Sequence, residues 1–201
     1  IKFAFHKTKN IPKMIIFSRN RRLRTNESIR SLVRETSLSS HDFVMPMFVM
    51  EGENIQEPIP SMPGIFRRRI DLTVKECKEL FQLGIKAVNI YMKVPENLKD
   101  NKGTESWNPN GLMQRSIREI KNAIPEMVVM PDVALDPYSV FGHDGIITNG
   151  QIDNDATNEA LARMAVSVAE AGADVVAPSD MMDGRVSVIR EALEENGHVN
   201  V

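Results

Sequence analysis

Short apolar runs alternate with amphipathic helical patterns along most of this 201-residue chain. Four runs typical of buried strands are each followed by a helical pattern, and the pairs cover residues 43–49 and 73–83, 85–91 and 111–123, 127–133 and 155–171, and 173–177 and 185–195. Residues 198–201 resemble the opening of a fifth strand. Alternation of this kind predicts parallel strands joined by right-handed helical crossovers.

Two α/β folds fit this order of elements: an open doubly wound sheet and a (β/α)8 TIM barrel. No Gly-x-Gly-x-x-Gly motif follows any predicted strand, which argues against a dinucleotide-binding sheet. Four strand–helix units and a further strand make half a barrel, and whole barrels run to about 250 residues. We therefore expect residues 43–201 to be the N-terminal part of a TIM-barrel catalytic domain, truncated at strand five, and residues 1–42 to be an extended arm. Residues 1–13 are candidates for a non-native extension, because Met14 is a plausible start.

The charge of the chain is small overall but uneven. The net charge is −2, which does not indicate a nucleic-acid-binding protein, yet the first 24 residues hold eight Lys or Arg and no acid. Three interpretations compete for this segment: a targeting peptide, a nucleic-acid arm, or an arm that docks on a partner subunit. Apolar residues among the charges favour the docking arm, with Ile29, Leu32 and Val33 buried against the partner. The expected location is the cytoplasm, or an organelle matrix if residues 1–20 are a targeting peptide.

Two further classes of structure are excluded by composition. No apolar stretch approaches the roughly 18 residues that a membrane helix needs. Cys77 is the only cysteine, so neither a disulfide nor a thiolate zinc site can form within one chain. Cys77 lies on the apolar face of its helical pattern and is predicted to be a core residue.

An acid-rich loop follows the third predicted strand. Asp132 stands at the strand end, and Asp136, His143 and Asp144 follow it, at the edge where α/β barrels place their chemistry. Asp136 and Asp144 are candidate ligands for a hard cation such as Mg²⁺, and His143 joins them if the ion is Zn²⁺. The competing interpretation is that these residues simply form turns.

A second cluster, Ala177 to Arg185, follows the fourth strand in the same way. Ser179, Asp180 and Asp183 are candidate site residues, and the alternative is that either aspartate caps the helix that follows. Arg185 is equally suited to bind a carboxylate or to pair with Asp183. No lysine follows Lys121, so this half of the chain has acids but no amine nucleophile.

These motifs together resemble the porphobilinogen synthase family, also called δ-aminolevulinic acid dehydratases. The resemblance covers about residues 17–201, and it is carried by residues 21–24, 45–49, 61–64, 131–138, 142–145 and 177–185. It implies a TIM barrel whose arm wraps a neighbouring subunit, usually in a homo-octamer. It also implies the condensation of two 5-aminolevulinate molecules to porphobilinogen, in haem and tetrapyrrole biosynthesis.

The resemblance assigns roles to several residues. Asp132, Ser179 and Asp180 match active-site positions, whereas the two Schiff-base lysines of the family are expected beyond Val201. The three cysteines of zinc-dependent members are replaced by Ala134, Asp136 and Asp144, which implies the zinc-independent branch that uses Mg²⁺ or monovalent ions. No organic cofactor is expected, and the substrate-contact residues are unknown.

We therefore expect a lyase as the parent protein and no activity from these 201 residues alone. Two alternatives stay open: another metal-assisted barrel lyase or aldolase, and a non-catalytic truncated chain that assembles with full-length subunits. The unpaired strand edges of a half barrel also predict aggregation or poor folding of the isolated chain.

Overall fold

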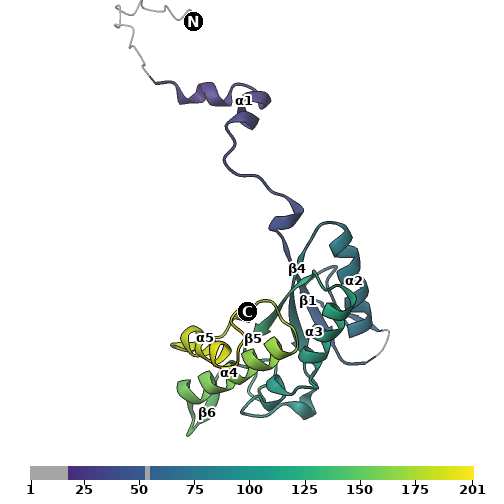
Figure 1. Ribbon diagram of the computed structural model, residues 1–201, viewed down its shortest axis with the longest axis vertical. Coiled ribbons are helices and arrows are strands. Elements are labelled where there is room, and N and C mark those ends of the chain that lie inside the picture. The colour runs from purple at the N-terminus through teal and green to yellow at the C-terminus, as the bar shows by residue number, and fades with distance from the viewer. Residues whose placement is uncertain (1–17, 53–54) are drawn as a thin grey trace, which may run out of the picture. The chain divides into compact units, whose positions relative to one another are not determined.

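The computed structural model describes residues 18–52 and 55–201, and these divide after Leu38 into two units (Figure 1). The first seventeen residues, on which the targeting and docking interpretations partly rest, lie outside the described part.

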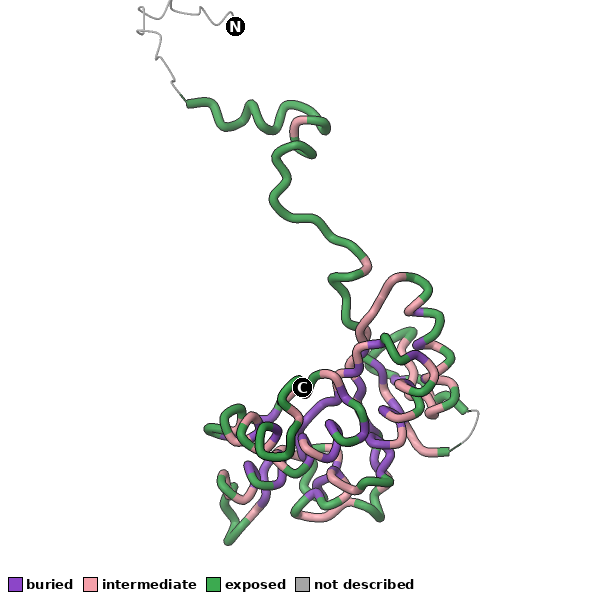
Figure 2. Tube along the Cα trace, in the orientation of Figure 1, coloured by how far each residue is buried: buried purple, intermediate pink, exposed green. Residues whose placement is uncertain are grey.

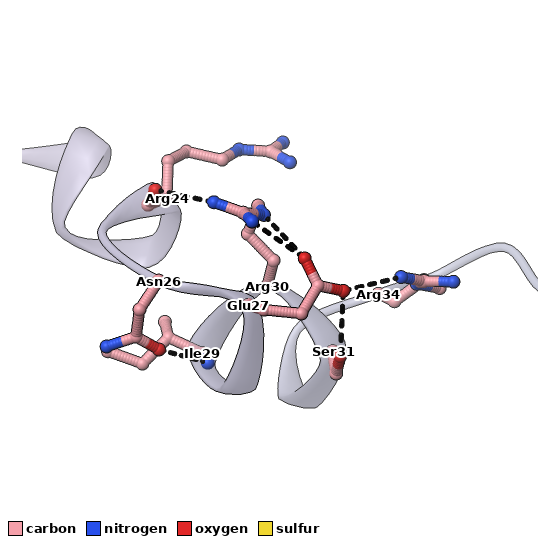
Figure 3. Close-up of polar contacts among 7 residues, drawn as sticks. All are labelled: Arg24, Asn26, Glu27, Ile29, Arg30, Ser31 and Arg34. Atoms are coloured by element: carbon pink, nitrogen blue, oxygen red, sulfur yellow. Dashed lines mark hydrogen bonds and ion pairs between the residues drawn. The ribbon is translucent and has the colours of Figure 1, made fainter.

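The described part of the first unit is a short helical segment. It contains a 3-10 helix, η1 (Asn20–Arg24), and a six-residue α-helix, α1 (Glu27–Leu32). The Asn26 side chain caps α1 by accepting a hydrogen bond from the Ile29 N–H at 2.9 Å (Figure 3). Glu27 contacts the guanidinium groups of Arg30 and Arg34, at 2.7 and 3.4 Å (Figure 3). Neither helix contains a buried residue.

The second unit is built on a six-stranded sheet in the order β2-β3-β1-β4-β5-β8. All neighbouring strands are parallel except β2 and β3, and a separate antiparallel hairpin is formed by β6 and β7. The strands are β1 (Val44–Met50), β2 (Gln56–Pro58), β3 (Phe66–Arg68), β4 (Ala87–Lys93), β5 (Val128–Val133), β6 (Ile146–Thr148), β7 (Gln151–Asp153) and β8 (Ala177–Pro178). The parallel order β1-β4-β5-β8 confirms the predicted alternation of strands and crossover helices.

Four α-helices follow the parallel strands. They are α2 (Ile70–Gln82), α3 (Leu112–Ala123), α4 (Asn154–Glu170) and α5 (Arg185–Glu195). Of the short 3-10 helices, η2 (Ser40–Asp42) precedes β1, and η3 (Glu96–Leu98) and η4 (Thr104–Trp107) lie between β4 and α3. Figure 1 shows α2, α3, α4 and α5 side by side in chain order. Gly84 ends α2 with φ of +91°, a conformation that glycine adopts without the steric cost of a Cβ.

The core lies between the strands and these helices, where buried segments concentrate (Figure 2). Val88, Ile90 and Val129 point from β4 and β5 into it and are completely buried. Cys77 on α2 is also completely buried, as predicted, and burial raises the pKa of its thiol to about 12. Within residues 18–52 and 55–201, no helix combines the length and apolar character needed to cross a membrane.

Several predicted boundaries were wrong. The strand expected at 173–177 is reduced to Ala177 and Pro178, because Asp174 accepts hydrogen bonds from the Val129 N–H and the Lys121 ammonium where ladder bonds would form. The strand expected at 198–201 is a turn, closed by a hydrogen bond from the Val201 N–H to the His198 carbonyl. The strands β2, β3, β6 and β7 were not predicted, since three-residue strands carry too little periodicity to detect.

Candidate active site

The carboxyl ends of β5 and β8 lie beside each other in the sheet. Asp132 is paired in register with Ala177, and Val133 with Pro178, so the loops after the two strands start at the same edge. A cavity of about 670 Å³ opens at this edge. Its lining includes five residues singled out from the sequence: Asp132, Asp136, His143, Asp144 and Ser179.

Asp132 and Ser179 form the direct contact of this site. The Ser179 hydroxyl donates a hydrogen bond of 2.6 Å to Oδ1 of Asp132, from the residue that immediately follows β8. Asp132 is only 6% exposed, and its burial raises its pKa. The Ser179 hydrogen bond lowers the pKa, whereas the negative charges of Asp144 and Asp180 raise it. The site therefore combines a carboxyl group whose raised pKa favours proton exchange with a hydroxyl that orients this carboxyl group.

Asp136 and Asp144 face the same cavity from the loop after β5. Partial burial and the charges of Asp144 and Asp132 raise the pKa of Asp136 to about 6. The two carboxyl groups therefore compete for a proton, and a cation bound between them would relieve the same repulsion.

His143 also lines the cavity, but its imidazole is already engaged. Its Nδ1 accepts a hydrogen bond of 3.1 Å from the Gly145 N–H. Among the residues that the structure describes, no group of three or more His, Cys, Asp or Glu side chains is placed to hold a metal ion. A three-ligand zinc site of the kind considered for His143 is therefore not formed by the described residues.

Asp180 is buried beneath the loop and does not line the cavity. Its Oδ1 accepts a hydrogen bond of 2.7 Å from the Met182 N–H, and its Oδ2 lies 3.5 Å from Nε of Arg185. Arg185 therefore pairs with Asp180, and not with Asp183, which was one of the two alternatives that the sequence left open. The predicted aspartate cap of α5 was wrong, because the residue at the cap position is Gly184 and no side chain caps the helix.

Several cavity residues were missed from the sequence. The rings of Phe48 on β1 and Tyr91 on β4 stack at 5.4 Å between centroids, and both line the cavity. Lys93, at the end of β4, lines it too and lies 2.8 Å from Glu57. Strand periodicity could have found Tyr91 and Lys93, because alternate residues of one strand face the same side of a sheet.

Comparison with known proteins gives a consistent result. The family model of delta-aminolevulinic acid dehydratase matches residues 17–201. The chain belongs to this family. The enzyme of Chlamydia pneumoniae is 47% identical over 180 residues, which are 90% of this chain and 54% of that protein. The chloroplastic enzyme of Chlamydomonas reinhardtii is 50% identical over 186 residues, which are 92% of this chain and 48% of that protein.

A solved structure supports the same assignment. The Toxoplasma gondii delta-aminolevulinic acid dehydratase (porphobilinogen synthase), in complex with the reaction product porphobilinogen, superposes with a TM-score of 0.89 at 45% identity. The match covers 92% of this chain and 53% of that one. The chain thus spans about half the length of the relatives it matches, and its α/β fold corresponds to that part of the family's TIM barrel, as predicted.

Proposed function

We propose that this chain forms part of a porphobilinogen synthase, which condenses two molecules of 5-aminolevulinate to porphobilinogen with loss of two waters. The observation that carries the proposal is the Asp132–Ser179 contact in a cavity at the carboxyl edge of the sheet, in a chain that belongs to this family. The catalytic lysines of the family's reaction are proposed to lie in the half of the protein that these 201 residues do not represent.

In this reaction Asp132 is the group suited to move protons. Its burial disfavours the ionised form and raises the pKa of the carboxyl, which favours acceptance and return of a proton. Ser179 holds Oδ1 of Asp132 by its hydrogen bond, and Asp132 lines the cavity in which substrate would bind. The loss of each water requires a proton to reach a departing oxygen, and Asp132 can deliver it in the cavity. The family resemblance also implies an active-site role for Asp180, whose buried carboxyl accepts a hydrogen bond from the Met182 N–H in the loop that carries Ser179.

We also propose a Mg²⁺ ion, and not Zn²⁺, held by Asp136 and Asp144. Two carboxylates suit Mg²⁺, which keeps several of its waters and needs few protein ligands. The donor atoms of both side chains are oxygens. Cys77 is completely buried in the core and does not line the cavity. When bound, the ion would supply positive charge to substrate oxygens beside Asp132.

The first unit is proposed to be an assembly arm that docks on a second copy, ultimately in an octamer. Leu32 on α1 is 84% exposed and Leu38 is 79% exposed, although both are large and apolar. Such residues need a partner surface to be buried. Deletion of residues 1–38 should lower the mass of the assembly measured by light scattering, and an unchanged mass would contradict the proposal.

The proposed location is the cytoplasm or an organelle matrix, with no membrane partner and no nucleic acid. Fluorescence microscopy of the tagged whole protein, with and without residues 1–20, distinguishes the two compartments. A matrix signal that depends on residues 1–20 would identify them as a targeting segment.

The enzymatic proposal is tested with the protein expressed from its complete coding sequence. Purified protein is stripped of metal with a chelator and then supplied with 5-aminolevulinate and either Mg²⁺ or Zn²⁺. Porphobilinogen should form with Mg²⁺, and Asp144→Asn should raise the Mg²⁺ concentration needed. Absence of product under both conditions would exclude the proposed activity, and recovery by Zn²⁺ alone would exclude the assignment of the ion.

A further inference from the structure

Two asparagines of α4 hold the loop that carries Ser179. The peptide N–H of Asp183 donates to Oδ1 of Asn154 at 2.8 Å, and Nδ2 of Asn154 lies 3.2 Å from the Asp183 carbonyl. The same carbonyl accepts a hydrogen bond of 2.8 Å from Nδ2 of Asn158. Asn154 and Asn158 are four residues apart and therefore share one face of the helix. We call these three residues and their three hydrogen bonds the asparagine clamp.

The loop needs such support because β8 is only two residues long. Ladder pairing ends at Pro178, so Ser179 is the first residue that the sheet does not fix. Beyond it, the loop is attached at Met182, whose side chain is buried in the core, and at Asp183 through the asparagine clamp. The position of Ser179 is thus set between the strand on one side and these attachments on the other.

Capping of α4 does not account for the clamp. The cap of that helix is Asp153, whose side chain accepts a hydrogen bond from the Ala156 N–H at 3.1 Å. Asn158 lies a turn inside the helix, where asparagine is a poor helix former, and it is only 6% exposed. Its Oδ1 is buried without a hydrogen-bond partner. A buried amide that uses only its donor has a cost in stability, which points to a role in holding the loop.

We propose that Asn154 and Asn158 are positioning residues for the Ser179–Asp132 contact. By fixing the Asp183 peptide, they keep the Ser179 hydroxyl 2.6 Å from Oδ1 of Asp132. They touch neither the cavity nor its acids, since neither residue lines it. The catalytic part of this inference rests on the proposed function, whereas the mechanical part concerns the loop alone.

The test is a double-mutant cycle in the protein expressed from its complete coding sequence. Asn158→Leu is nearly isosteric and removes the donor together with the unpartnered oxygen, so the fold should be retained. It should lower kcat about tenfold, with KM changed less than about twofold, because small displacements of a catalytic group are costly. In a Ser179→Ala background the same substitution should lower kcat less than about twofold, because the contact it serves is already gone.

Asn196→Ala is the matched control. Asn196 is exposed at the opposite end of α5 and donates a side-chain hydrogen bond of 2.8 Å to the Ala192 carbonyl. Its loss weakens α5 without touching the loop, so kcat should be unchanged. Equal losses from Asn158→Leu in both backgrounds, no loss in either, or a loss in the control as large as that of Asn158→Leu, would each overturn the proposal.

A second readout separates this inference from the proposed function. If the unmodified protein forms no porphobilinogen, the function fails and the clamp is judged by amide hydrogen exchange of residues 177–184. Exchange should be about tenfold faster in Asn158→Leu and Asn154→Ala than in the unmodified protein, and unchanged in Asn196→Ala. Unchanged exchange in the first two variants would overturn the mechanical part as well.

Discussion

The loops after β5 and β8 both contain several aspartates but use their carboxyl groups in opposite ways. The first presents Asp136 and Asp144 to the cavity. The second turns Asp180 inward until its side chain is completely buried, and it presents a hydroxyl, Ser179. Both loops begin at paired residues of the same sheet edge. Two acids that each follow a strand at the same sheet edge can therefore differ in whether they reach the cavity.

The physical difference lies in the length and the attachment of the two loops. The loop after β5 runs for more than ten residues before the β6–β7 hairpin, and this leaves room for its acids to reach solvent. The loop after β8 has six residues before α5 and is attached through Met182 and the asparagine clamp. In this short loop the Asp180 carboxyl is completely buried, and Nε of Arg185 lies 3.5 Å from its Oδ2.

The largest effect is expected from Asp132→Asn, on activity. The amide keeps the shape of the carboxyl but cannot exchange a proton, so kcat should fall by about 10² to 10⁴. The measurement is porphobilinogen formation by the whole protein, with Asp71→Asn, an exposed position in the first turn of α2, as control. A loss of less than about tenfold would mean that Asp132 does not move protons in the slow step.

The next effect contrasts the two adjacent methionines of the second loop. Met182 is 2% exposed and Met181 is 54% exposed. Met182→Ala should lower the free energy of unfolding by about 2–5 kcal/mol, because it leaves a cavity in the core. Met181→Ala should change it by less than about 0.5 kcal/mol. Equal losses of the free energy of unfolding in the two variants, measured by urea denaturation, would show that the loop does not depend on the Met182 attachment.

Asp180→Asn should act on stability more than on activity. The substitution leaves the Arg185 guanidinium without its charged partner, at a cost of about 1–3 kcal/mol, since Arg185 is partly exposed. Thermal unfolding measures this cost, and kcat at a temperature well below the midpoint should fall far less than in Asp132→Asn. A loss of kcat as large as that of Asp132→Asn, with unchanged stability, would instead support the catalytic role that the family resemblance implies for Asp180.

Much of this architecture could be predicted from the sequence because its elements are long and periodic. The helix over residues 185–195 was predicted with its observed bounds, and β5 to within one residue. The acids of the first loop were correctly expected at a strand end. The burial of Asp180 could not be predicted from the strand–loop pattern, because that pattern does not show which way a loop side chain turns; in the structure its carboxyl contacts the Met182 N–H and Arg185. The lost part of the fourth strand depends on Lys121 and Asp174, a long-range pair.

The smallest expected effect is on the pH dependence of stability, and it comes from the loop after β5 alone. The pKa of Asp136 is raised from 3.8 to about 6, so the folded protein binds this proton more tightly than the unfolded chain does. The stability that the protonated group contributes is complete below pH 3.8 and is lost as the pH rises through 6. Above pH 6 the folded state therefore carries an ionised carboxyl beside Asp144 and Asp132.

Asp136→Asn removes that ionised group and should stabilise the protein, in the presence of a chelator. The gain in the free energy of unfolding should be absent near pH 4, grow until about pH 6, and then stay near 1 kcal/mol. This gain is reduced by solvent screening, because Asp136 is exposed to solvent on one side. Urea denaturation at several pH values measures it. In a companion experiment, Asp144→Asn should lower the pKa of Asp136 in carboxyl NMR titrations, since Asp144 contributes to raising it. A gain independent of pH would indicate that packing, and not repulsion among the three acids, distinguishes this loop from the one after β8.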